Sequence, residues 1–158
     1  MVFFYVSLFM ADILEVANRL AKTDVTKTLV KILNRKSIQK FIIGLNTNVQ
    51  LLGLGEDSQG VQLSAIGGIY AESTIRLSKT KKQNRSHINL KDTGAFYKTF
   101  DIVVSNNASF KITANTMKGD QDLEDRWGDK IVGLQPENVI LVLDRLCEEY
   151  YKTLYRGL

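Results

Sequence analysis

Apolar residues recur at helical spacing through the first third of the chain. Ile13, Val16, Ala17 and Leu20 fall on one face of a helix. A second helical run follows, and Asp24 is placed to cap its first turn. Its apolar positions are Leu29, Val30, Leu33, Ile38 and Ile42. The pattern therefore predicts two helices that meet near residues 22–24.

Glycines interrupt this helical pattern beyond residue 50. Gly53, Gly55 and Gly60 surround an acidic pair, Glu56-Asp57, so we expect a loop here. The segment lacks the Lys-Ser/Thr pair of a phosphate-binding loop and the spaced oxygen ligands of a calcium loop. A nucleotide or calcium site is therefore not favoured.

Strand-like alternation begins at Phe100. Residues 100–104 and 110–114 are rich in β-branched and aromatic side chains, and the Asn106-Asn107 pair between them suits a turn. The acidic cluster that follows, at residues 120–125, could hold paired catalytic carboxylates, but its spacing favours the exposed start of a helix. The sequence thus predicts an antiparallel hairpin and then a short helix.

A long helix is expected at the C-terminal end. Pro136 suits its first turn, and we expect it to end near Tyr155, before Gly157. Its apolar stripe comprises Val139, Val142, Leu143, Leu146, Tyr150 and Leu154. The chain therefore reads as α+β: a small antiparallel β-sheet flanked by two N-terminal helices and a long C-terminal helix.

The segment Ile88-Asn89-Leu90-Lys91-Asp92-Thr93-Gly94-Ala95-Phe96-Tyr97-Lys98-Thr99-Phe100 contains a turn with a physical explanation. Asp92 and Thr93 can each fold a short polar side chain onto nearby backbone N–H groups, and Gly94 accepts a positive φ. We therefore predict a structural turn at Asp92, Thr93 and Gly94.

This segment also carries a family resemblance. Three further stretches belong with it: Phe41-Ile42-Ile43-Gly44-Leu45-Asn46-Thr47 with Gln50-Leu51, then Gly55-Glu56-Asp57-Ser58-Gln59-Gly60, and finally Arg126-Trp127-Gly128-Asp129-Lys130-Ile131-Val132-Gly133-Leu134-Gln135-Pro136-Glu137-Asn138. Together the four stretches resemble the virion morphogenesis or tail-completion proteins of tailed bacteriophages. The version it is most similar to occurs in phages of Bacteroides-type hosts. The resemblance covers roughly residues 40–140.

The resemblance implies a structural virion protein, made in the cytoplasm of the bacterial host and built into the virion. Such head–tail connector proteins assemble in several copies into a neck ring that joins portal to tail. Its partners would be copies of itself and the portal or other neck and tail proteins. On this interpretation the protein is not an enzyme, holds no cofactor or metal, and acts through its surfaces.

Composition agrees with one globular domain. The chain has 158 residues, 44% of them hydrophobic, with one proline and a net charge of +4. Cys147 and His87 are each the only residue of their type, which excludes an intrachain disulfide and leaves little for nucleophilic catalysis. The helical surroundings of Cys147 predict a buried thiol.

A basic segment precedes the Asp-Thr-Gly turn. Its cations are Arg76, Lys79, Lys81, Lys82, Arg85 and Lys91, with no acidic residue between them. A solvated surface loop is one interpretation, and contact with an acidic partner surface or a phosphate backbone is the other. No aromatic residue interleaves the basic ones from Lys79 to Lys91, so contact with DNA would not read sequence.

Residues 1–11 form an uncharged apolar arm ahead of a single domain at residues 12–158. The arm is too short to span a bilayer, which needs about 20 apolar residues. Translation from Met10 is one explanation, and residues 1–9 would then not be made. The other is that the arm lies against another chain.

Two further functions stay open from the sequence. A DNA-binding or packaged virion protein would use the basic segment together with the basic second helix, whose cations are Lys22, Lys27, Lys31, Arg35, Lys36 and Lys40. A small hydrolase built on Asp92-Thr93-Gly94 ranks third, because the bulky residues after the turn differ from those of aspartic proteases.

Overall fold

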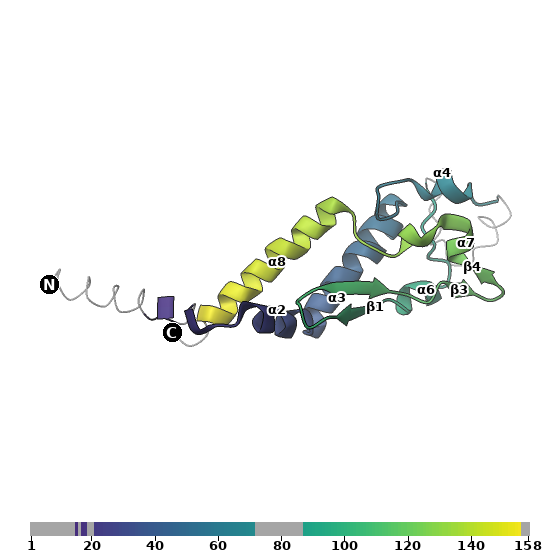
Figure 1. Ribbon diagram of the computed structural model, residues 1–158. Coiled ribbons are helices and arrows are strands. Elements are labelled where there is room, and N and C mark those ends of the chain that lie inside the picture. The colour runs from purple at the N-terminus through teal and green to yellow at the C-terminus, as the bar shows by residue number, and fades with distance from the viewer. Residues whose placement is uncertain (1–14, 16, 19–20, 72–86, 156–158) are drawn as a thin grey trace.

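The computed structural model describes residues 15, 17, 18, 21–71 and 87–155, and confirms the α+β class (Figure 1). Helices and two small antiparallel sheets make up an elongated body. The long C-terminal helix runs along one side of this body. Residues 1–11 and most of the basic segment, including Arg76, Lys79, Lys81, Lys82 and Arg85, lie outside the described residues.

The two N-terminal helices meet where the sequence predicts. Residues 21 and 22 are helical, residues 23 and 24 are not, and α2 follows at Val25–Leu33. The Asp24 carboxylate accepts a hydrogen bond of 2.9 Å from the backbone N–H of Lys27, which confirms it as the N-cap.

The second helical run is not continuous, contrary to the prediction. Helix α2 ends at Leu33, and α3 starts again at Lys36–Gly44. Between them Arg35 has an extended backbone, with ψ of 129°. Its guanidinium bonds Glu149 Oε2 at 2.8 Å and Thr153 Oγ1 at 3.1 Å on the C-terminal helix. These contacts hold the bend in place.

The predicted glycine break at Gly53 is wrong. After α3 the chain continues as η1, a π-helix at Leu45–Leu54, and Gly53 lies inside it. The helix ends two residues later at Gly55, whose left-handed φ of 69° provides a typical helix stop. A π-helix of this length is rare, because most occur as single-turn bulges. Helix α4, at Leu63–Gly67, follows the loop.

The hairpin agrees with the sequence to within a residue at each end. Strand β1, Asp101–Val104, pairs antiparallel with β2, Phe110–Thr113, so that Ile102 faces Ile112. The intervening turn is closed by the Asn107 side chain, which accepts from the Ser109 hydroxyl at 2.7 Å. A single-turn helix, α6 at Ala95–Lys98, leads into β1.

The acidic cluster at residues 120–125 lies in a second, smaller hairpin and at the start of a helix. Strands β3, Met117–Lys118, and β4, Gln121–Asp122, are followed at once by α7, Leu123–Trp127. Asp122 caps α7 by accepting from the N–H of Glu124 at 3.0 Å, which confirms the predicted helix start. The 3₁₀ turn η2 occupies Asp129–Ile131.

The last helix, α8, spans Pro136–Tyr155, as predicted. It packs against α2. The Arg35–Glu149 ion pair, at 2.8 Å, links the bend after α2 to α8 near the C-terminal end of that helix. Hydrogen bonding from Lys152, together with the nearby Arg145 and Arg35 charges, lowers the pKa of Glu149.

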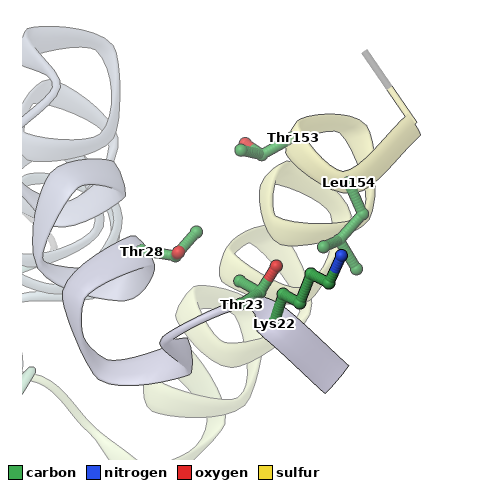
Figure 2. Close-up of a pocket in the computed structure, with 5 residues that line it drawn as sticks. All are labelled: Lys22, Thr23, Thr28, Thr153 and Leu154. Atoms are coloured by element: carbon green, nitrogen blue, oxygen red, sulfur yellow. The ribbon is translucent and has the colours of Figure 1, made fainter. Parts of the chain in front are cut away.

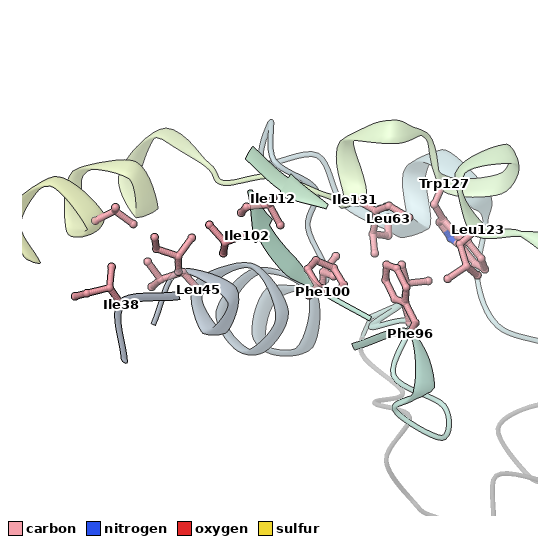
Figure 3. Close-up of a cluster of buried hydrophobic side chains, with 14 of the residues drawn as sticks. Ile38, Leu45, Leu63, Phe96, Phe100, Ile102, Ile112, Leu123, Trp127 and Ile131 are labelled. Atoms are coloured by element: carbon pink, nitrogen blue, oxygen red, sulfur yellow. The ribbon is translucent and has the colours of Figure 1, made fainter. Parts of the chain in front are cut away.

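One hydrophobic core joins these elements (Figure 3). Helices α2 and α3 contribute isoleucines that are almost fully buried, the hairpin contributes Ile102 and Ile112, and Phe96 packs edge-on against Phe100 at 5.0 Å. From α8, Val142 enters this core. The core therefore runs lengthwise between the helices and the hairpin.

Candidate functional site

A cluster of buried amides, which we call the polar junction, joins η1 to the start of α8. It consists of Asn46, Gln50, Gln135 and Asn138, all buried. Asn46 donates to the Ile131 carbonyl at 3.3 Å and accepts from the N–H of Gly133 at 3.2 Å. Buried amides must have such partners, because leaving one unpaired costs about 1–3 kcal/mol.

Gln50 is the centre of the polar junction. Its Oε1 accepts from the Gln135 N–H at 2.9 Å and from Asn138 Nδ2 at 2.8 Å. Its Nε2 donates to the Gly133 carbonyl at 3.1 Å. One fully buried side chain on η1 thereby fixes the turn ahead of α8 and the first turn of α8 itself.

The glycine-rich loop at residues 55–60 is attached to the same junction. Gln135 Nε2 donates to Glu56 Oε2 at 2.8 Å and to the Asp57 carbonyl at 3.1 Å. The Asp57 carboxylate accepts from the N–H groups of Gln59 and Val61, at 2.8 and 2.9 Å. The acidic pair thus closes its own loop and anchors Gln135.

The segment that leads to the Asp-Thr-Gly turn lies against the end of η1. His87 Nε2 donates to the Leu52 carbonyl at 2.9 Å. The Ile88 carbonyl comes so close to Gly55 that a Cβ there would lie 2.6 Å away. The four stretches that carry the motif resemblance therefore meet along η1.

Within the turn itself, Gly94 has a φ of 79° and its N–H donates to the Lys91 carbonyl. Thr93 Oγ1 accepts from the Ala95 N–H at 3.3 Å. Asp92 departs from the sequence expectation: the hydrogen bonds of the described residues include none from a backbone N–H to its carboxylate. Strand β3 instead brings Lys118 to it, at 2.7 Å.

Two tyrosine hydroxyls form hydrogen bonds with the backbone of the same segment. The Tyr97 hydroxyl donates to the Asn89 carbonyl, and the Tyr70 hydroxyl accepts from the Leu90 N–H at 3.1 Å. Burial raises the pKa of the Tyr97 phenol further above its ordinary value. Lys91, the one described cation of the basic segment, lies over the Tyr97 ring at 5.8 Å.

A group of exposed basic residues lies on α2 and α3. It is formed by the exposed side chains of Lys27, Lys31, Lys36 and Lys40. In the part of the chain that the structure describes, none of these ammonium groups makes an ion pair. Arg35 differs, because Glu149 neutralises it. We call these four lysines the α2–α3 basic face.

Helix α8 presents an apolar surface to solvent, which we call its outer face. It consists of Val139, Ile140, Leu143, Cys147, Tyr151 and Tyr155, all exposed. Ile140, Leu143 and Tyr151 are 57%, 55% and 58% exposed, whereas Val142 is 2% exposed. Apolar groups of this size in water favour association.

The outer face corrects two sequence predictions. Val139 and Leu143, expected on the buried stripe, are exposed, and Cys147 is exposed rather than buried. The polar junction and the ion pair to Arg35 turn the face with Asn138, Val142 and Glu149 inward. One sequence signal pointed to this exposure. Residues 139–143 are all apolar, so apolar side chains occur on every side of the helix there, and packing against one core cannot bury all of them.

An open pocket marks where the N-terminal chain reaches α8 (Figure 2). It is lined by Lys22, Thr23, Thr28, Thr153 and Leu154. Leu154 is 6% exposed, although neighbouring residues of the outer face are open to solvent. The chain that enters α2 thus lies beside the C-terminal end of α8.

The described ranges hold neither a metal-ligand cluster nor a helix that could cross a membrane. No three His, Cys, Asp or Glu side chains there gather as metal ligands would. No helix in those ranges is both long enough and apolar enough to cross a bilayer. Comparisons with protein-family models, curated proteins and solved structures find no match to this chain.

We expect Gly55→Ala to destabilise the protein far more than Gly94→Ala. Both glycines have positive φ, but a Cβ at Gly94 meets nothing within 4 Å, whereas one at Gly55 overlaps His87 and the Ile88 carbonyl. Strain alone should lower the free energy of unfolding by about 1 kcal/mol at Gly94, and strain plus overlap by about 3 kcal/mol at Gly55. Urea unfolding of both variants checks this. Equal losses would contradict the close approach.

Gln50→Leu should cost about 2–4 kcal/mol of unfolding free energy, because it leaves the Gln135 N–H, the Asn138 amide and the Gly133 carbonyl buried without partners. Gln62→Leu is the matched control, since Gln62 is exposed. Thermal unfolding followed by circular dichroism gives the comparison. A Gln50→Leu protein as stable as the control would show that the junction contributes little.

Proposed function

We propose that this protein is a structural virion protein of a tailed phage that assembles in several copies into a ring in the neck or tail and joins portal to tail. The observation that carries the proposal is the outer face of α8. An exposed apolar surface along a 20-residue helix is typical of a protein interface. The motif resemblance gives this interface its biological setting.

The placement of the resembling motifs supports a structural role. Several polar side chains of these motifs make internal contacts: Asn46, Gln50 and Gln135 in the polar junction, Asp57 within its own loop, and Asp92 with Lys118. Such contacts maintain a rigid body that carries α8 along one side. Rigid bodies with fixed faces suit repeated assembly, because each copy must present the same geometry to the next.

The remaining parts of the proposal follow from this role. The partners are other copies of the chain and the portal or other neck and tail proteins. The protein works in the virion after assembly in the host cytoplasm, and it does so without a reaction, a cofactor or a membrane.

Electron microscopy of the purified full chain, alone and mixed with the portal protein of the same phage, tests this proposal. We expect closed rings of one diameter, or particles bound to the portal, because identical head-to-tail contacts close on themselves. Sedimentation should show the same species in solution. A protein that remains monomeric at all concentrations and does not bind the portal would contradict the proposal.

The α2–α3 basic face favours a second candidate function, non-specific contact with DNA. Its four lysines are exposed and lack internal partners among the described residues. Cations of this kind bind phosphates without reading bases, and they do so with a strong dependence on salt. A protein that lines a DNA channel and a packaged DNA-binding protein could both use such a face.

For the DNA alternative, we expect a K27E/K31E double variant to lose most duplex binding measured by fluorescence anisotropy. The binding constant of the unchanged protein should fall steeply as salt rises, with a log–log slope of roughly −0.9 for each phosphate contacted. K111E is the matched control, because Lys111 is equally exposed but lies on β2. Binding that is weak and independent of salt would exclude this function.

A further inference from the structure

The outer face of α8 needs a partner with a particular chemistry. The exposed parts of its side chains amount to on the order of 600 Å² of largely apolar surface, the upper end of what monomers expose in one patch. Glu137 and Asp144 border it and make no ion pair in the described part of the chain. An acidic partner would therefore be repelled, and a partner rich in charge would lose hydration on contact.

Residues 1–11 of the chain match this chemistry. The segment Met-Val-Phe-Phe-Tyr-Val-Ser-Leu-Phe-Met-Ala carries no charged side chain. Its burial therefore removes no charged side chain from water. Its length also fits. The outer face from Val139 to Tyr155 extends roughly 24 Å at 1.5 Å per residue, and eleven residues can span from about 16 Å as a helix to about 36 Å when extended.

The point of entry indicates which copy supplies the segment. Lys22 lies beside Thr153 and Leu154, at the C-terminal end of α8 (Figure 2). The described helical residues before it, the purple fragment in Figure 1, lie past that end of α8. A chain that leaves in this direction is placed to reach a neighbour.

We infer that residues 1–11 of one copy bind the outer face of α8 in a second copy. Each copy then gives one segment and receives another, so the contact is head-to-tail and closes into a ring or continues as a filament. The inference rests on the proposed neck ring for its closed form only. The contact itself is a property of the purified chain.

Disulfide trapping tests the contact, because Cys147 is the only cysteine and lies exposed in the middle of the outer face. A S7C variant of the full chain adds a second thiol within the segment. Oxidation by copper–phenanthroline with dissolved oxygen joins two thiols into one disulfide, and oxygen accepts the two electrons and two protons. We expect a ladder of dimers, trimers and longer chains on a non-reducing gel.

The single-cysteine proteins are the controls. The unchanged chain, with Cys147 alone, and a S7C/C147S variant can each form at most a disulfide-linked dimer. Species beyond the dimer therefore require both thiols of one copy to react. A mixed dimer of the S7C/C147S protein and a size-tagged unchanged chain, formed in excess of the two homodimers, requires a bond between residue 7 of one copy and Cys147 of another. A mixture of the two single-cysteine proteins that forms only the two homodimers would overturn the inference.

A matched pair of substitutions locates the contact. L143E places a carboxylate on the outer face, whereas V103E places one on β1, and the two native side chains are 55% and 53% exposed. In the S7C background we expect L143E to reduce the ladder at least about tenfold and V103E to leave it intact. Circular dichroism should show both variants folded, because neither position is in the core. An equal effect of the two would overturn the inference.

The remaining outcomes separate this inference from the proposed function. A disulfide formed only within one chain, seen as a faster-migrating monomer, would show that the segment covers its own α8 and would overturn the inference. No disulfide would overturn it as well. Rings seen by electron microscopy without any cross-linking would support the proposed neck ring and refute the contact between residues 1–11 and the outer face. A ladder without rings or portal binding would support the contact and refute the neck ring.

Discussion

The structure depends on the hydrogen bonds of Gln50. This fully buried amide connects η1 with the turn at Gly133 and with the first turn of α8. Because the Gln135 N–H, the Asn138 amide and the Gly133 carbonyl are turned toward this buried side chain, their hydrogen bonds depend on it. The direction in which α8 leaves the body is therefore set by one side chain on a helix more than eighty residues earlier in the sequence.

The polar junction decides which residues of α8 face solvent. Asn138 and Val142 turn inward at its N-terminal end, and Glu149 meets Arg35 near its C-terminal end. With two such anchors the helix cannot rotate to bury Leu143 and Tyr151. The outer face is thus a consequence of internal polar contacts, and an apolar core alone would have favoured a different rotation.

The surfaces that project from this body differ in chemistry. The outer face of α8 is apolar with carboxylates at its border, and the α2–α3 face carries lysines without internal partners. A molecule with unlike faces associates head-to-tail more readily than face-to-face, since like charges repel in the second arrangement. This asymmetry fits the proposed ring, and the uncharged N-terminal segment provides a means of joining one copy to the next.

Local patterns were sufficient to predict the α+β class, the cap at Asp24, the hairpin and the extent of α8. Each depends on spacing, capping or β-propensity between neighbouring residues. The bend at Arg35, the π-helix that passes through Gly53, the Asp92–Lys118 ion pair and the exposure of Cys147 depended on tertiary structure. In each case the deciding partner is remote in sequence or the outcome depends on how a whole helix is rotated. Sequence periodicity shows that a helix has apolar residues, but only its packing partners determine which of them are buried.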